Sequence, residues 1–194
     1  MTAIEEALAE LSGSLEGKRV PYMLVGGLAN AIWGEPRATL DIDVTVWVDE
    51  QQVPDLVAFL RASFRVLVPD PVTFIRDTRV LPLESTTGVR VDVIFGLLPL
   101  ERQAIERARR LAIAGTEVRV CTPEDLILMK IVSDRGRDLD DAKAITRRRA
   151  ESLDFAYLEP RIRALSVELE KPEIIQRWED WKGEAQGPRT EDSQ

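Results

Sequence analysis

The sequence predicts an α/β (α+β) protein with a mixed β-sheet core flanked by helices and a C-terminal helical extension. Short β-branched runs alternate with amphipathic stretches up to about residue 121. Only helical patterns follow, up to about residue 182, before a polar end. We therefore expect the core at 1–121, a helical part at 122–182 and a disordered tail at 183–194, a size that allows one core domain with an appendage.

The core elements follow in order from their local signals. Thr2 and Glu5 form a capping box that opens a helix to about Leu15. Residues 40–48 (LDIDVTVWV) alternate strongly and are rich in β-branched side chains, which is typical of a strand. By the same signals we expect strands at 20–25, 40–48, 64–68, 73–83 and 89–95, the last two as a hairpin, and helices at 28–33, 49–63 and 100–110.

The second half begins with a small hairpin and continues as helices. Gly115-Thr116 separates two short runs at 111–114 and 117–121, which predicts the hairpin. The Thr-Pro pair at 122–123 supplies an N-cap and a proline at the first helical position, so a helix begins there and runs to about 133. Further helices are expected at 138–150, 154–170 and 172–181.

The composition excludes several classes of chemistry. The chain has no histidine, which rules out histidine-based triads, histidine general bases and histidine-ligated zinc or haem. Its single cysteine, Cys121, rules out an intramolecular disulfide and a cysteine-cluster metal site. Any reaction must therefore use carboxylates, Lys, Arg, Ser or Thr, or a metal ion held by oxygen ligands.

The net charge of −8 argues against a protein whose whole surface binds the nucleic-acid backbone. The charge is uneven, with a net +3 over 101–149, against −6 over 1–100 and −5 over 150–194. This basic middle, which includes Arg147–Arg149, can supply a groove for a polyanion. The alternative for these three arginines is a solvated helix C-terminus, where the helix dipole favours cations.

The expected location is the cytoplasm, with no membrane partner. The apolar runs are far shorter than the roughly 20 residues that a membrane span needs. The first residues, MTAIEEALAEL, are acidic and amphipathic, unlike the basic start of a signal peptide.

Three carboxylates interrupt strands that are otherwise apolar. Asp41 and Asp43 alternate with Ile42, so both lie on the same face of their strand. Asp92 lies within VRVDVIF, although Asp is a poor strand former. If the two strands are neighbours, three carboxylates meet and form an oxygen-ligand site suited to Mg²⁺ or Mn²⁺. The alternative is a set of solvent-facing carboxylates on a polar sheet face.

Gly26-Gly27 lies between an apolar strand and a helix. Glycine allows the backbone to approach a ligand closely, and the N–H groups at a helix N-terminus favour a phosphate. The alternative is an ordinary tight turn. The glycine pair therefore indicates a phosphate site only in combination with the carboxylates.

Together, the glycine pair, the Asp-x-Asp and the later single Asp resemble the nucleotidyltransferase superfamily with the DNA polymerase β-like core. The run at 22–44 (YMLVGGLANAIWGEPRATLDIDV) is similar to the minimal nucleotidyltransferases of the AbiEii/AbiGii toxin type. The segments PEDLILMK at 123–130 and RGRDLDD at 135–141 match a Lys-bearing helix and an Asp-x-x-Asp segment of that branch. The resemblance covers roughly residues 20–145.

The resemblance implies a metal-dependent transfer of a nucleoside monophosphate from a nucleoside triphosphate to an acceptor hydroxyl. It assigns metal binding and catalysis to the three carboxylates, with Mg²⁺ or Mn²⁺ as cofactor. It assigns the nucleotide phosphates to Gly26, Gly27, Arg37 and Lys130, and Lys130 would also be catalytic. Arg37 can alternatively pair with Asp41 or lie on the surface, and Lys130 can alternatively be an ordinary exposed lysine. Asp138 can orient Lys130 or an arginine, but Asp138 and Asp141 can equally be acids favoured at a helix start.

The acceptor implied by the resemblance is an RNA or tRNA end or a protein, and the chain would then be a toxin with an antitoxin protein as partner. A first alternative is an antibiotic-type enzyme that modifies a small molecule, because the acidic N-terminal half can furnish a pocket for a cationic drug. A second is a catalytically silent nucleotide-binding or regulatory module, although all three carboxylates are present.

Overall fold

The protein folds into two compact units, each with its own packing. The structure, a computed structural model, describes residues 1–36 and 38–186. Of these, unit 1 holds residues 1–29 and 38–122, and unit 2 holds residues 30–36 and 123–186. Helix α2 (Gly26–Trp33) gives its first turn to unit 1 and its second turn to unit 2.

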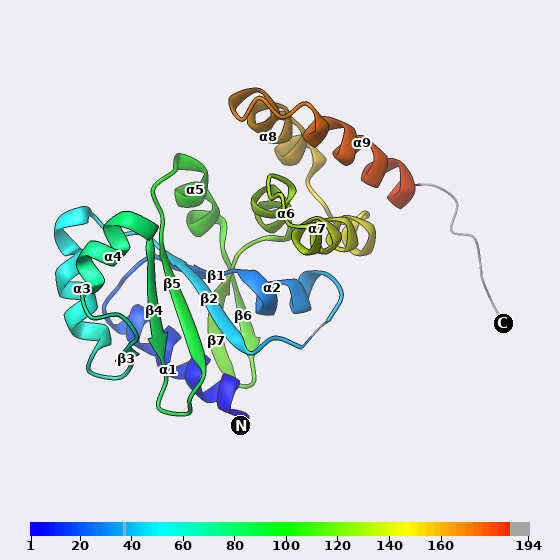
Figure 1. The fold of residues 1–194 in the computed structure, drawn as a ribbon. Coiled ribbons are helices and arrows are strands. Elements are labelled where there is room, and N and C mark those ends of the chain that lie inside the picture. The colour runs from blue at the N-terminus through cyan, green and yellow to red at the C-terminus, as the bar shows by residue number, and fades with distance from the viewer. Residues whose placement is uncertain (37, 187–194) are drawn as a thin grey trace. The chain divides into compact units, whose positions relative to one another are not determined.

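Unit 1 is built on one mixed β-sheet (Figure 1), which over the described residues has the strand order β3-β4-β5-β2-β1-β7-β6. The central strand β2 pairs in parallel with β5 and antiparallel with β1, and β1 pairs in parallel with β7. The strands are β1 (Tyr22–Leu24), β2 (Asp41–Val46), β3 (Arg65–Val66), β4 (Val80–Glu84), β5 (Arg90–Phe95), β6 (Arg109–Ile113) and β7 (Thr116–Val120).

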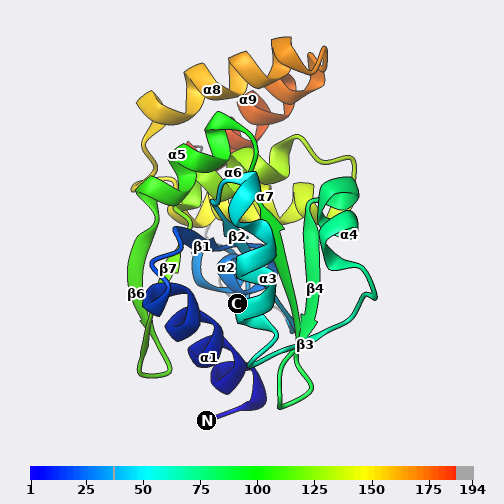
Figure 2. The same ribbon diagram turned by 90° about the vertical axis from the view of Figure 1, so that its left-hand side faces the viewer.

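Helices cover the apolar face of this sheet. The elements are α1 (Ala3–Gly17), the 3-10 turn η1 (Glu50–Gln52), α3 (Val53–Leu60), α4 (Pro71–Thr78) and α5 (Pro99–Arg107). Figure 2 shows α1 and α3 on the same face of the sheet. Ile42 and Val44 of β2 and Val91 and Val93 of β5 are fully buried, because the alternation of each strand turns them toward this core. The predicted mixed α/β class is therefore confirmed.

The first helix begins as its sequence signal predicts. Thr2 Oγ1 accepts a hydrogen bond from the Glu5 backbone N–H at 3.3 Å, and Glu5 Oε2 accepts one from the Thr2 N–H at 2.7 Å. This capping box satisfies two backbone donors that the first turn of a helix leaves without partners.

The predicted strand at 73–83 is wrong over its first half, which forms α4. Asp70 is the N-cap of this helix and accepts a hydrogen bond from the Thr73 N–H at 3.2 Å, and Pro71 occupies the first turn. The helix ends at Arg79, whose left-handed φ of 63° turns the chain into β4. An Asp-Pro helix start thus outweighs the β-branched residues that follow it.

Other boundaries also differ from the predicted ones. The helix expected at 100–110 ends at Arg107, and the following arginines already belong to β6, which pairs with β7 over its whole length. The strand expected at 64–68 shortens to β3, an edge strand of two residues. The helix expected at 49–63 divides into η1 and α3.

Unit 2 is a helical unit, as expected for the second half. Its helices are α6 (Pro123–Ile131), α7 (Gly136–Arg149), α8 (Phe155–Glu168) and α9 (Glu173–Gln186). Helix α7 packs against α6 and α9, and α8 packs against α6 and α9. Trp178 is 1% exposed, and its ring centroid lies 6.0 Å from that of Phe155, which places it in the core of this unit.

Of the tail predicted at 183–194, residues 183–186 belong to α9 and the remainder lies outside the described residues. In the described part of the chain, no helix is both long and apolar enough to cross a membrane.

Candidate active site

The sheet register brings the predicted carboxylates onto one face of unit 1. Parallel pairing of β2 with β5 sets Asp43 directly beside Asp92, and Asp41 beside Arg90. Residues paired across neighbouring strands point to the same side of a sheet, so all four charged side chains share this face. Asp41 is exposed, whereas Asp43 and Asp92 are half-buried.

The glycine turn that joins β1 to α2 lies tightly against this face. A Cβ atom placed on Gly26 would lie 1.9 Å from Asp43 Oδ2, and one on Gly27 would lie 2.6 Å from Thr39 Oγ1. Gly26 also has a φ of +63°, a conformation that other residues adopt only at a cost. Only glycine at position 26 therefore leaves room for the Asp43 carboxylate directly beside the backbone.

A cation of the protein already lies among the carboxylates. Arg90 Nε lies 3.2 Å from both Asp92 Oδ1 and Asp92 Oδ2. The pKa of Arg90 is raised, first by its hydrogen bond to Asp92 and further by the charges of Asp92, Asp41 and Asp43. The carboxylate face is thus strongly negative and attracts cations.

The donor set fits a hard divalent ion, because carboxylate oxygens are the ligands that Mg²⁺ and Mn²⁺ prefer. Within the residues that the structure describes, no three acidic or cysteine side chains converge as a complete set of metal ligands. In this arrangement the Arg90 guanidinium pairs with Asp92.

Lys130 lies in unit 2, and it is buried rather than exposed. Its side chain is 7% exposed, and Nζ donates to Asp138 Oδ1 at 2.9 Å and to Asp141 Oδ2 at 2.8 Å. The alternative of an ordinary surface lysine is therefore wrong. Its predicted role toward a nucleotide phosphate stays a prediction, and the structure adds that two carboxylates fix the ammonium in place.

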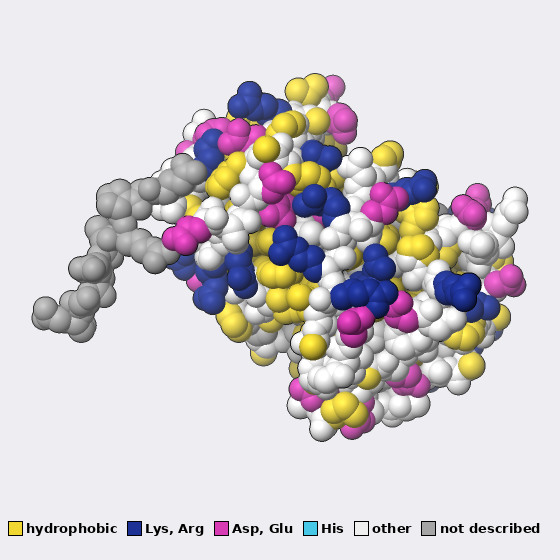
Figure 3. All heavy atoms as spheres, turned by 180° about the vertical axis from the view of Figure 1, so that it is seen from behind, with side chains coloured by type: hydrophobic (Ala, Val, Ile, Leu, Met, Phe, Trp, Pro, Cys, Tyr) yellow, Lys and Arg dark blue, Asp and Glu magenta, His cyan; other side chains and the backbone are white. Residues whose placement is uncertain are grey.

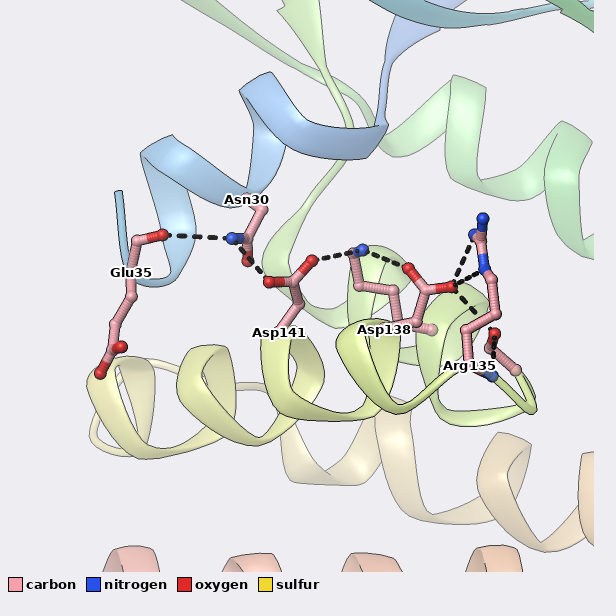
Figure 4. A network of polar contacts seen from close by, with 7 residues as sticks. Asn30, Glu35, Arg135, Asp138 and Asp141 are labelled. Carbon is pink, nitrogen blue, oxygen red and sulfur yellow. Dashed lines mark hydrogen bonds and ion pairs between the residues drawn. The ribbon is translucent and has the colours of Figure 1, made fainter. Parts of the chain in front are cut away.

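Both carboxylates have further partners within unit 2 (Figure 4). Asp138 Oδ2 accepts from Ser133 Oγ at 2.9 Å and from Arg135 Nε at 2.6 Å. Burial raises the pKa of Asp138, but the hydrogen bonds from Lys130 and Ser133 together outweigh this effect. The net shift of the pKa is therefore downward. The carboxylate is thus held ionised.

Asn30 is a further member of this network that the sequence did not indicate. Its Nδ2 donates to Asp141 Oδ1 at 3.1 Å and to the Glu35 carbonyl at 3.2 Å, and the residue is 1% exposed. Asn30 and Asp141 are 111 residues apart in sequence, so no local pattern could have joined them. Arg90 was also missed, although a signal existed: it lies two residues before Asp92 in a strand and so shares its face.

The arginines of the basic middle have mostly structural partners. Arg147 pairs with Glu35 at 2.6 Å, and Arg149 donates to the Ile32 carbonyl at 2.7 Å and to the Trp33 carbonyl at 3.1 Å. The face in Figure 3 carries Lys and Arg as well as Asp and Glu side chains and, as the sequence requires, no histidine. Arg37, the remaining predicted phosphate ligand, lies outside the described residues.

Comparison with protein families decides the class of the chain. Residues 1–184 match the sequence profile of a family described as nucleotidyltransferase of unknown function (DUF6036). The chain belongs to this nucleotidyltransferase family. A search of curated proteins finds none that matches significantly.

Several solved structures share the fold of this chain. The antibiotic-resistance factor ANT(2'')-Ia in solution is 16% identical, with a TM-score of 0.59 over 92% of this chain and 100% of that chain. A crystal structure of ANT(2'')-Ia with adenylyl-2''-tobramycin is 16% identical, with a TM-score of 0.50 over 91% of this chain and 98% of that chain. An antigenic nucleotidyltransferase-like protein from Paracoccidioides brasiliensis is 18% identical, with a TM-score of 0.52 over 91% of this chain and 92% of that chain. The superfamily predicted from the glycine pair and the carboxylates is confirmed.

Proposed function

We propose that this member of the nucleotidyltransferase family transfers a nucleoside monophosphate from a nucleoside triphosphate to an acceptor hydroxyl, with Mg²⁺ or Mn²⁺ as cofactor, in the cytoplasm. One observation carries the proposal: the register sets Asp43 beside Asp92, and the Gly26 turn lies against the Asp43 carboxylate. This arrangement supports the proposal, because carboxylates of the kind that bind divalent ions lie beside a backbone turn that can approach a phosphate.

The residues of unit 1 have defined roles in this proposal. Asp41, Asp43 and Asp92 are the ligands for the divalent ions, which neutralise the triphosphate and polarise the reacting oxygens when bound. Asp92, which lies next to Asp43, would either hold the ion that activates the acceptor hydroxyl or accept the proton of that hydroxyl. The backbone N–H groups after Gly26 and Gly27 orient the phosphates. The acceptor oxygen forms a bond to the α-phosphorus, the bond to the β-phosphate oxygen breaks, and pyrophosphate leaves.

We propose an RNA or tRNA end or a protein as the acceptor, and a role as the toxin of a system with an antitoxin protein. This rests on the likeness of residues 22–44 and 123–141 to toxin-type enzymes. A second candidate is a small-molecule acceptor, since the fold is shared with an enzyme solved with an adenylylated aminoglycoside.

A labelling experiment tests the reaction and separates the acceptors. The full chain is incubated with each α-labelled nucleoside triphosphate and Mg²⁺ or Mn²⁺, in parallel with total RNA, with lysate protein and with an aminoglycoside and lincosamide panel. We expect label in one acceptor class and its loss with Asp43→Asn. The matched control is Asp77→Asn, an exposed carboxylate of α4 on the same unit.

The outcomes distinguish the three functional alternatives. Label in RNA or protein supports the toxin-type reaction, and label in a drug supports the antibiotic-type reaction. Absence of label with every acceptor, together with no calorimetric binding of the metal–nucleotide complex, would overturn the proposal. Binding without label would leave a regulatory module as the function.

A further inference from the structure

We propose that Arg90 regulates the carboxylate site by acting as its resident cation, which competes with the divalent ion for Asp92. This inference rests on the proposed function, because it concerns the same three carboxylates. It adds a residue to which no role has been assigned, and it predicts that the metal affinity of the site is set by a guanidinium that must move away.

The contact with Asp92 is the first observation behind this inference. Arg90 Nε lies 3.2 Å from each oxygen of the Asp92 carboxylate, so a single N–H donates to both oxygens. The Asp92 side chain is 23% exposed, and the Arg90 side chain is 53% exposed. A divalent ion would use lone pairs of the same two oxygens, so the guanidinium and the ion compete for Asp92, and the exposed guanidinium has room to swing outward.

The position of Arg90 in the sheet is the second observation. It pairs with Asp41 of β2 on one side and lies two residues before Asp92 on its own strand. Its charge therefore lies within the field of the same carboxylates that would hold the metal. A positive charge at this position weakens the attraction of the site for any second cation.

The third observation supplies a place to which Arg90 can move. On its other side, Arg90 pairs with Glu84 of β4, and Glu84 in turn pairs with Arg65 of β3. Arg65, Glu84, Arg90 and Asp41 thus form a row of alternating charge across four strands. Arg65 Nη2 binds Glu84 Oε1 at 2.6 Å. Arg65 and Arg90 therefore compete for Glu84, and the presence of Arg65 favours the position of Arg90 at Asp92.

Two changes to this row are expected to strengthen metal binding. Arg90→Gln removes the competing charge and leaves Asp92 to the ion, and we expect Mn²⁺ to bind about tenfold more tightly. Arg65→Gln keeps the Arg90 charge but frees Glu84 to attract it away from Asp92. We expect a smaller gain for this variant, about two- to threefold. Both side chains are more than half exposed, so neither variant opens a cavity in the core.

The experiment measures Mn²⁺ binding to the full chain without nucleotide, by electron paramagnetic resonance of the free ion. The control is Arg76→Gln, because Arg76 is an exposed α4 arginine that pairs with Asp77. This control makes the same change in net charge outside the row. Circular dichroism verifies that each variant remains folded. A nucleotidyl-transfer assay on the wild type is run in parallel.

Tighter binding by Arg90→Gln than by Arg76→Gln supports the inference, including the case in which the wild type binds too weakly to measure. Equal affinities of the two variants, or weaker binding by Arg90→Gln, overturn it while leaving the proposed function intact if the wild type binds Mn²⁺ and transfers nucleotide. Saturable binding by none of the proteins overturns the inference, and the proposed function then depends on whether the wild type transfers nucleotide in the parallel assay. If Arg90 instead binds a phosphate, Arg90→Gln leaves the Mn²⁺ affinity unchanged and lowers the nucleotide affinity, which overturns the inference.

Discussion

The ammonium of Lys130 donates to the Asp141 carboxylate across 2.8 Å, and the two side chains are only 7% and 8% exposed. Asp138, on the preceding turn of α7, accepts from the same ammonium at 2.9 Å. One buried cation therefore compensates two buried carboxylates, with help from Arg135 at the surface. Charges removed from water are stable only while they are paired, so unit 2 depends on this lysine whatever its role toward a nucleotide.

Removing the charge of Lys130 should destabilise the protein severely. We expect Lys130→Met to lower the free energy of unfolding by about 3–5 kcal/mol, because Asp138 and Asp141 lose their buried partner. Urea denaturation followed by circular dichroism measures the change. Lys143→Met is the control: Lys143 is 44% exposed and pairs with Glu184, so its loss should cost less than about 1 kcal/mol.

Equal stability of the two lysine variants would contradict the importance of the buried pair. The predicted phosphate role of Lys130 is measured separately, by nucleotide titration at a temperature where the variant remains folded. A fall in nucleotide affinity supports direct contact with a phosphate. Unchanged affinity restricts Lys130 to holding α6 and α7 together.

The lowered pKa of Asp138 predicts a pH dependence with a defined sign. Its folded pKa lies below the unfolded value of about 3.9. The carboxylate therefore contributes stability that is fully present above the unfolded pKa and is lost as pH falls through the folded pKa. We expect the stability difference between wild type and Asp138→Asn to shrink as the pH is lowered below about 4. A constant difference between pH 6 and pH 2.5 in urea denaturation would contradict this.

The sequence predicted best what depends on local periodicity. The alternation around Asp43 and Asp92 indicated both strands, and the capping box at Thr2 indicated the first helix, because these signals arise from neighbours in the chain. At residues 73–78 two local signals conflicted, and the β-branched residues misled where the Asp70–Pro71 helix start decided the structure.

The contacts of unit 2 were harder to predict because they join distant parts of the chain. The burial of Lys130 had a signal, since its helix is apolar on nearly all sides and such helices are buried. The hydrogen bond between Asn30 and Asp141 had none, because Asn30 lies in a short apolar helix with no periodic polar partner. Only the tertiary fold brings these side chains together.

Two neighbouring arginines of α7 should differ in their effect on stability. Arg149 donates to the carbonyls of Ile32 and Trp33, and its guanidinium lies 5.2 Å from the Trp33 ring centroid. We expect Arg149→Met to cost about 2 kcal/mol of unfolding free energy, since it leaves helix C-terminal carbonyls without a charged donor. Arg148 is exposed, so Arg148→Met should change stability by less than about 0.5 kcal/mol. Thermal denaturation of both variants gives the comparison, and equal losses would refute the capping role of Arg149.

The close approach of Gly26 to Asp43 gives a test that separates activity from stability. In Gly26→Ala the new Cβ would lie 1.9 Å from Asp43 Oδ2, so the carboxylate must move, and the φ of +63° adds strain. We expect nucleotidyl transfer to fall by about 100-fold or more, because displacement of a reacting group by about 1 Å has an effect of this size. The free energy of unfolding should fall by only about 1–3 kcal/mol.

Gly13→Ala is the matched control for that variant. Gly13 lies inside α1, and a Cβ atom placed on it would meet no other atom within 4 Å, so alanine should fit and raise the free energy of unfolding by about 0.5–1 kcal/mol. Activity should stay at the wild-type level. If Gly26→Ala keeps full activity while its stability falls, the Asp43 carboxylate does not take part in the reaction, and the site must be sought away from the β1–α2 turn.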